Sequence, residues 1–95
     1  MEKIVKMVTT ESMKPTLFRG DKVACIKVSL DDLYWWGGYI HYLEFKDGQT
    51  IIRRVYDEGE NIKIKCDGVN GGSQMIPKKY VQAIYRVIAS ARTYG

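Results

Sequence analysis

Short runs of strand-type residues, separated by polar turns that contain glycine, most strongly limit what this chain can fold into. The clearest turn is Asp47-Gly48, because Asp-Gly is a favoured hairpin turn between apolar runs. The runs on either side, residues 39–45 and 50–56, are therefore predicted to form a hairpin. Further strands are predicted at residues 3–9, 22–28, 61–66 and 81–92, and a short turn at 78–80. With almost no helix expected, this spacing predicts an all-β, barrel-like single domain that covers residues 1–95.

Residues 29–36 interrupt the strand pattern. Ser29 can cap a short helical turn, and Asp31 and Asp32 lie near the start of that turn, where negative charge is favourable. The adjacent pair Trp35-Trp36 either covers an edge of the core or forms a recognition surface, and we favour the core edge.

Composition excludes little but sets useful limits. The chain has 95 residues and a formal net charge of +4, a mild excess that permits contact with nucleic acid or a membrane surface without arguing for either. Cys25 and Cys66 have no metal-type spacing, so we expect free, buried thiols in a reducing compartment. Residues 67–73 are rich in glycine but lack the lysine of a phosphate loop, which favours a plain loop. No cofactor is expected, and without a signal-sequence core or a membrane-length apolar run we expect a cytoplasmic protein.

One short motif carries chemistry. In the run Ser12-Met13-Lys14-Pro15-Thr16, a serine stands between a predicted strand and a turn fixed by Pro15. On residue types alone this is a serine in a turn. A second segment, residues 48–56, places Arg53 inside an apolar strand and follows it with another arginine and a valine. Together the two segments resemble the superfamily of LexA-like repressors and type I signal peptidases.

The resemblance implies a role for each matching residue. Ser12 stands at the position of the nucleophile, and Arg53 stands where the family has the lysine that acts as general base. Thr10 stands where signal peptidases use a second hydroxyl donor to the oxyanion, beside the Ser12 N–H. Arginine stays protonated and has no lone pair with which to accept a proton. We therefore expect that peptidase activity is lost and that Arg53 instead holds Ser12 or pairs with Glu11.

The alternative is an active serine endopeptidase with a displaced base, performing self-cleavage or peptide cleavage. The hairpin is expected to place His41 opposite residue 54, one pair beyond Arg53, so a half-buried strand histidine is favoured over a substitute base. No Ala-Gly or Cys-Gly bond precedes Ser12, so cleavage in cis is not supported within these residues. Three further lysines are expected to be solvated: Lys14, Lys22 and Lys46.

The family resemblance favours the soluble, repressor-like branch over the membrane-anchored peptidases. It implies a regulatory domain that forms a homodimer, while DNA is bound only through an upstream helix-turn-helix domain that this chain does not contain. We expect the strand at residues 81–92 to form the dimer interface, because it alternates cleanly and lies at a chain end. Direct nucleic-acid binding is weakly supported, because the basic residues are scattered and no recognition helix is evident.

Overall fold

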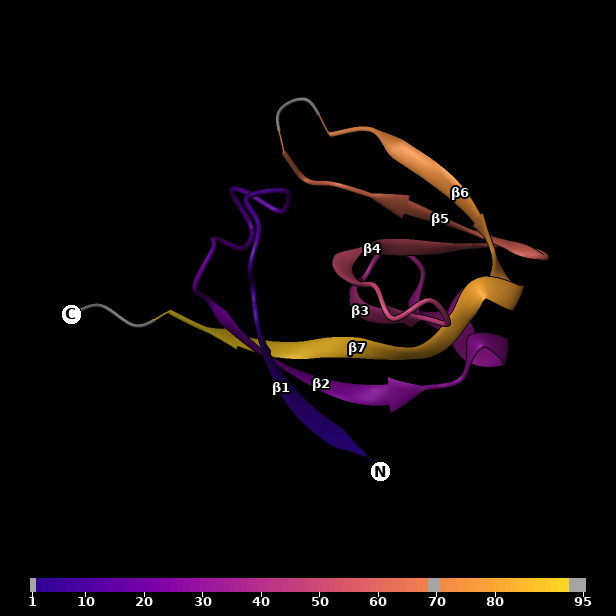
Figure 1. Ribbon diagram of the computed structural model, residues 1–95, viewed down its shortest axis with the longest axis horizontal. Helices are drawn as coiled ribbons and strands as arrows, with labels where there is room; N and C mark the ends of the chain where they lie inside the picture. The colour runs from indigo at the N-terminus through magenta and orange to yellow at the C-terminus, as the bar shows by residue number, and fades with distance from the viewer. Residues whose placement is uncertain (1, 69–70, 93–95) are drawn as a thin grey trace.

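A computed structural model describes residues 2–68 and 71–92, and these form one antiparallel sheet of seven strands (Figure 1). Residues 69 and 70 of the predicted loop at 67–73 lie outside the described part. Two short 3₁₀ helices, η1 (Leu30–Trp36) and η2 (Lys78–Tyr80), interrupt the succession of strands. The strands are β1 (Lys3–Met7), β2 (Lys22–Val28), β3 (Ile40–Phe45), β4 (Thr50–Glu58), β5 (Asn61–Lys65), β6 (Ser73–Pro77) and β7 (Val81–Ala91).

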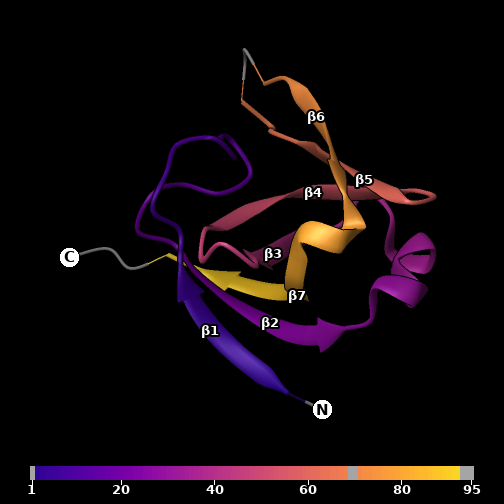
Figure 2. The same cartoon turned by 45° about the vertical axis from the view of Figure 1, so that its right-hand side comes forward.

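The strands lie side by side in the order β1-β2-β7-β3-β4-β5-β6, so β1 and β6 are the two edges of an open sheet. The sheet is strongly bent: β5 and β6 lie on one side of the hairpin β3–β4, and β1, β2 and β7 lie on the other (Figures 1 and 2). The all-β, antiparallel prediction is confirmed. Closure into a barrel is not, because β1 does not pair with β6 within the described residues.

Two clusters of buried side chains pack against the sheet. In the first, Met13 and Leu17 of the β1–β2 connection pack against Val23 and Cys25 of β2. In the second cluster, η1 packs against the middle of the sheet. The fully buried members of this cluster include Leu33, Leu43, Val55 and Ile62.

Tyr42 and Tyr85 belong to the first cluster and their chain neighbours Leu43 and Ile84 to the second, so the two clusters lie on opposite faces of β3 and β7. The buried residues alternate along β2 and β5 because each of these strands faces one cluster.

The strand at residues 81–92, which we expect to form the dimer interface because it lies at a chain end, is not an edge of the sheet. β7 lies inside the sheet and pairs with β2 on one side and β3 on the other. Its position at the end of the chain does not decide its position in space, because its pairing partners are far away in sequence. β7 pairs with β2 over residues 84–91 and with β3 over residues 81–86, so most of its backbone is used within the sheet.

The expected register of the hairpin β3–β4 is wrong by one residue. His41 pairs with Arg53 instead of residue 54, and Leu43 pairs with Ile51. The loop has three residues, because Phe45 N–H donates to the carbonyl of Gln49 at 2.9 Å and Gly48 adopts a φ of 93°. This is the three-residue hairpin loop with glycine in the left-handed region, whereas the expectation assumed a two-residue loop.

The helical turn at residues 29–36 forms as predicted. The Ser29 hydroxyl oxygen accepts a hydrogen bond from the Asp31 N–H at 3.1 Å, which is the N-cap contact. Trp36 is half-buried, and the Arg86 guanidinium lies 3.7 Å from the centre of its ring. Trp35 is 66% exposed, so the expectation that both tryptophans cover the core is wrong for Trp35.

Both cysteines are free thiols, but only Cys25 is fully buried. Cys66 is half-buried just beyond β5, so the expectation of deep burial holds for Cys25 alone. Burial raises the pKa of the Cys25 thiol to about 11, which lowers the fraction of reactive thiolate further.

We predict that a thiol reagent added to the native protein modifies Cys66 first and reaches Cys25 only on unfolding. The reason is that burial both shields the Cys25 sulfur and keeps it protonated. Mass spectrometry of the protein during maleimide labelling measures this, and Cys66→Ser should remove the fast phase. Labelling of Cys25 before Cys66 would contradict the burial assigned to these two side chains.

Candidate functional site

The serine loop, residues 9–20 between β1 and β2, is closed at its neck by two backbone hydrogen bonds. Val8 N–H donates to the Asp21 carbonyl and Gly20 N–H donates to the Val8 carbonyl, each at 2.8 Å. Inside the loop, Met13 is 1% exposed and Leu17 is 3% exposed, and both belong to the first core cluster. The residue after Ser12 therefore anchors the loop to the core by burial of an apolar side chain.

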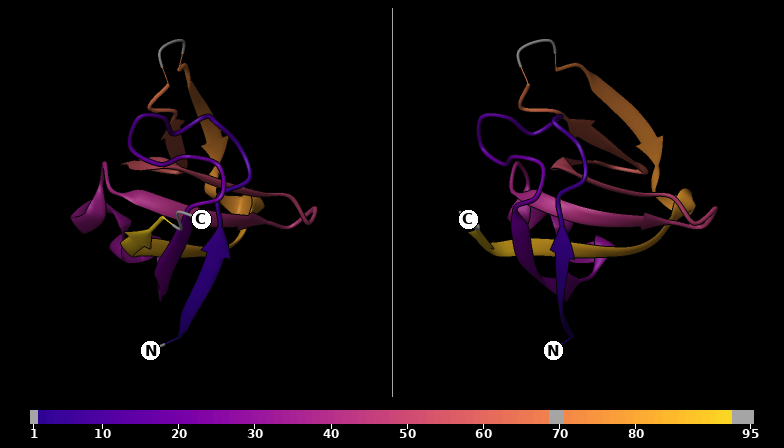
Figure 3. Two further views of the ribbon diagram at one scale, coloured as in Figure 1. Left: turned by 90° about the vertical axis from the view of Figure 1, so that its left-hand side faces the viewer. Right: turned by 60° about the vertical axis from the view of Figure 1, so that its left-hand side comes forward.

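The far end of the serine loop is tied to the sheet through Asp67. Thr16 Oγ1 donates to Asp67 Oδ2 at 2.6 Å, and Arg54 Nε donates to Asp67 Oδ1 at 2.7 Å. The neighbouring Gly68 N–H donates to the Ser12 carbonyl at 3.0 Å. Figure 3 shows this loop rising from β1 toward the end of β5. Arg54, and not Arg53, is therefore the arginine that holds the far end of the serine loop, through Asp67.

Electrostatics favour this tie. Burial raises the pKa of Asp67, but the hydrogen bonds from Arg54 and Thr16 and the charges of Arg54 and Lys65 outweigh burial and leave that pKa below its usual value. A carboxylate that is ionised at neutral pH accepts from both neighbours at once. Arg54 also donates from NH1 to the Gly38 carbonyl at 2.9 Å, so its guanidinium is held on two sides.

The neck of the serine loop carries a second carboxylate. Asp21 is 3% exposed and receives two hydrogen bonds from Arg92, at 2.8 and 2.9 Å. It also accepts from the Phe18 N–H at 2.9 Å, which is the turn-closing contact that the sequence suggests. The hydrogen bond from Arg92 is the largest cause that lowers the pKa of Asp21 to about 2. The loop is therefore fixed at both ends by arginine–aspartate pairs.

Ser12 itself is half-buried, and its surroundings depart from those of a working oxyanion site. Its N–H points at the Thr10 hydroxyl oxygen, 3.5 Å away, so the two expected oxyanion donors contact each other. The preceding Glu11 forms an ion pair with Lys14. The expectation that Arg53 pairs with Glu11 or holds Ser12 is therefore wrong, since Arg53 has a different partner.

Arg53 lies where β4 extends beyond β5. Pairing with β5 begins only at Arg54, so the edge of β4 is free over residues 50–53. The hydrogen bonds of Phe45 with Gln49 and of Val55 with Tyr39 orient the odd-numbered residues of β4 toward β3. Ile52 therefore directs its N–H and carbonyl toward the free edge. Arg53 NH1 donates to that Ile52 carbonyl at 2.7 Å, so its guanidinium covers the free edge.

A cavity of about 370 Å³ lies along this free edge. Its lining includes Arg53 and Ile52 of β4, Tyr42 of β3, and Thr10 and Met13 of the serine loop. The structure thus brings Arg53 and Thr10 to one cavity, whereas Ser12 is not among the lining residues. Of the three residues expected at the site, two line the cavity and the serine lies beside it.

His41 is buried on β3, directly between two arginines. It pairs with Arg53 on β4 and with Arg86 on β7, which places the three side chains in one row across the sheet. Its Nδ1 lies 2.7 Å from the Tyr39 carbonyl and must donate to it, whereas Nε2 has no hydrogen-bond partner among the described residues. The pKa of His41 is lowered to about 4. Burial is the largest cause, and the charge of Arg86 also lowers this pKa. The expectation of a half-buried histidine is therefore corrected to a fully buried one.

No general base contacts the serine. Across residues 2–68 and 71–92, which contain every lysine and the single histidine, no amine or imidazole nitrogen hydrogen-bonds to the Ser12 hydroxyl. The three lysines expected to be solvated, Lys14, Lys22 and Lys46, are all exposed. No local pattern in the sequence indicates the roles of Thr16 and Asp67. Their contact joins positions 51 residues apart.

Comparison of the chain with protein-family models and with curated proteins found no match. The resemblance to LexA-like repressors and signal peptidases therefore depends on the serine motif and the Arg53 segment alone. Among the described residues, no helix has the length and apolar character needed to cross a bilayer.

Proposed function

We propose that this chain is a LexA-like regulatory domain that has lost peptidase activity and acts by forming a homodimer. The observation that carries the proposal is the Arg53 guanidinium, which donates to the Ile52 carbonyl at 2.7 Å. In the resemblance to LexA-like repressors, Arg53 takes the position of the general base. The LexA-like fold is part of the proposal, and the open antiparallel sheet supports it in outline. DNA would be bound by a separate helix-turn-helix domain, as in the regulators that the serine motif resembles.

Two physical effects of Arg53 oppose catalysis. A guanidinium has no lone pair that accepts the Ser12 proton near neutral pH. It also covers the outward-facing Ile52 carbonyl, which an extended substrate would need for backbone pairing along the free edge of β4. Both effects support a serine loop retained for structure, with Met13 in the core and Asp67 tied to Thr16 and Arg54. The native domain is expected to leave peptide substrates intact in a hydrolysis assay.

The dimer interface is now proposed on the outer face of β1 and β7. Val5 and Met7 are 61% and 55% exposed, and they alternate with Ile4, which packs toward the first core cluster. Ile88 is 46% exposed and follows Val87, which packs toward the same cluster. Val5 and Met7 therefore lie on the face of β1 turned away from that core. Ile88 lies at the irregularity in the β2–β7 register, and its exposure places it at the surface of β7. An exposed apolar patch on a small domain favours self-association.

We predict a homodimer at micromolar concentration and a monomer for the double variant Met7→Glu/Ile88→Glu. Two buried carboxylates at a symmetric interface oppose association, because each would lose its hydration without gaining a partner. Sedimentation velocity measures the change. Met75→Glu is the matched control, because it places the same charge at a 50% exposed methionine on the opposite edge of the sheet. A native protein that stays monomeric to high micromolar concentration would contradict dimerisation.

A further inference from the structure

The outer edge of β6 carries unpaired backbone groups. The hydrogen bonds Cys66 N–H to Gly72 carbonyl (3.3 Å) and Lys78 N–H to Glu60 carbonyl (2.9 Å) fix which residues of this segment face β5. By alternation, Ser73 and Met75 direct their N–H and carbonyl groups away from β5. β6 has no strand on that side, so these groups are available to another extended chain.

The two edges of the sheet differ in how they are protected. β1 carries Lys3 and Lys6, and charged edge residues are a common protection against unwanted strand pairing. β6 has the sequence SQMIP and contains no charged residue. Only Pro77, which lacks an N–H, limits pairing at its end. The β6 edge is therefore the less protected of the two.

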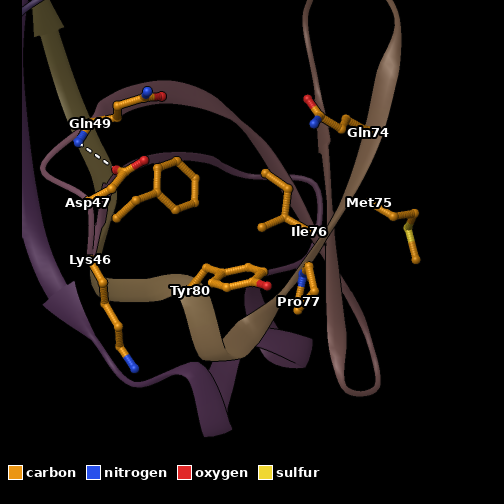
Figure 4. Close-up of a pocket in the computed structure, with 9 residues that line it drawn as sticks. Lys46, Asp47, Gln49, Gln74, Met75, Ile76, Pro77 and Tyr80 are labelled. Carbon is orange, nitrogen blue, oxygen red and sulfur yellow. Dashed lines mark hydrogen bonds between the residues drawn. The ribbon is translucent and has the colours of Figure 1, made fainter.

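An apolar cavity of about 470 Å³ lies beside β6, between this strand and the β3–β4 loop. Figure 4 shows Ile76 and Tyr80 facing this space, with Gln49 and Gln74 on opposite sides of it. A second cavity, of about 410 Å³, has four lining residues in common with the first and extends to Arg53. The two cavities thus form one groove beside β6, and we call it the β6 groove. It is lined mainly by Phe45, Ile51, Ile64 and Ile76, with Tyr80 at one end and Arg53 at the other.

The charges of the β6 groove favour a negatively charged occupant. Arg53 is the single charged side chain that lines the second cavity, and no ion pair of the described residues includes it. In the first cavity, Asp47 accepts from the Gln49 N–H at 2.9 Å, while Lys46 is exposed at the rim. A carboxylate near Arg53 would therefore gain a partner that the chain itself does not supply.

We propose that the β6 edge binds an extended segment of a partner protein by strand addition, with apolar side chains at alternate positions followed by an acidic residue. Pairing with Ser73 and Met75 would supply the backbone hydrogen bonds, and side chains two residues apart would point to the same face and enter the groove. A second copy of this chain fits less well, because its own β6 offers no carboxylate to Arg53. This binding does not depend on whether Ser12 is catalytic.

The test is fluorescence anisotropy with a fluorescein-labelled peptide of sequence Thr-Val-Thr-Val-Glu-Glu. We expect saturable binding to the native protein, and binding about tenfold weaker for Met75→Pro, which removes an outward N–H without breaking the ladder to β5. Lys3→Pro is the matched control, because the Lys3 N–H points outward from the other edge strand in the same way and Lys3 is not part of the proposed dimer interface. It should bind the peptide as tightly as the native protein does. Replacing the two glutamates of the peptide by lysines should also weaken binding about tenfold.

Amide hydrogen exchange of the native protein gives a second readout that needs no variant. The Ser73 and Met75 amides should exchange fast in the free protein and become protected when the peptide is added. Unchanged affinity in Met75→Pro, or loss of binding in Lys3→Pro, would overturn the proposal. The proposal would also be overturned if the native protein formed a dimer that does not bind the peptide and that Met75→Pro dissociates. In that case a second copy of this chain would occupy the β6 edge.

Discussion

The Arg53→Lys variant is expected to acquire slow reactivity at Ser12, about a hundredfold above the native protein. An amine replaces the guanidinium beside the cavity that contains Thr10 and Met13, and a neutral amine can accept the serine proton. Partial burial disfavours the ammonium form and lowers the lysine pKa, so the reactivity should rise with pH as the lysine loses its proton. Single-turnover acylation across alkaline pH measures this rate.

Two further variants control this experiment. Adding Ser12→Ala to Arg53→Lys should remove the new reactivity, because the acyl group then has no acceptor. Arg54→Lys places an amine one residue further along β4, where the side chain belongs to the Asp67 tie, and it should give no reactivity. If Arg53→Lys reacts no faster than the native protein, the loss of activity has another cause, such as the position of Ser12 outside the cavity.

The second large effect is a loss of stability in mild acid caused by His41. Its pKa is about 4 in the folded protein and about 6.5 in the unfolded chain, so the unfolded chain binds more protons between these values. Stability is therefore fully present above about pH 6.5 and falls as the pH decreases through this window. The shift corresponds to a loss of about 3 kcal/mol by about pH 4. Arg86, which pairs with His41 from β7, stays charged throughout and makes protonation costlier.

Urea unfolding at a series of pH values measures this loss, and His41→Leu should flatten the curve between about pH 6.5 and about pH 4. The two arginine-paired carboxylates, Asp21 and Asp67, contribute mainly below this window. Asp21 has its pKa lowered to about 2, and Asp67 also has a lowered pKa, so their contributions disappear only in stronger acid. A pH dependence that persists unchanged in His41→Leu would contradict the assignment.

Local features of the fold could be predicted from the sequence, and non-local ones could not. The β2 strand, the Ser29 cap of η1 and the Asp47-Gly48 turn depend on a few neighbouring residues, and all three were found as expected. The position of β7 between β2 and β3 depends on pairing with strands far away in sequence, which alternation alone does not specify. The one-residue error in the β3–β4 register followed from the loop length, which the dipeptide does not determine.

The candidate site shows the same difference between local and non-local features. The serine motif pointed to Ser12, Arg53 and Thr10 as residues of interest, but not to the contacts that each makes. Arg54 and Asp67, which hold the serine loop, were missed because an ion pair between a strand and a distant loop leaves no periodic pattern. The outward N–H of Met75 was missed for a related reason, since strand order decides which edge is free.

The measurement that tests the central claim most directly is intact-mass analysis of the native protein after treatment with a serine-directed acylating reagent. The Ser12→Ala variant is treated in parallel, from about pH 7 to about pH 10, so that a displaced amine or imidazole base would be deprotonated in part of the range. If Arg53 occupies the base position, the native protein should form no more adduct than the Ser12→Ala variant does. An adduct that forms faster on the native protein and maps to Ser12 would contradict the loss of catalysis and would identify the chain as an active serine peptidase.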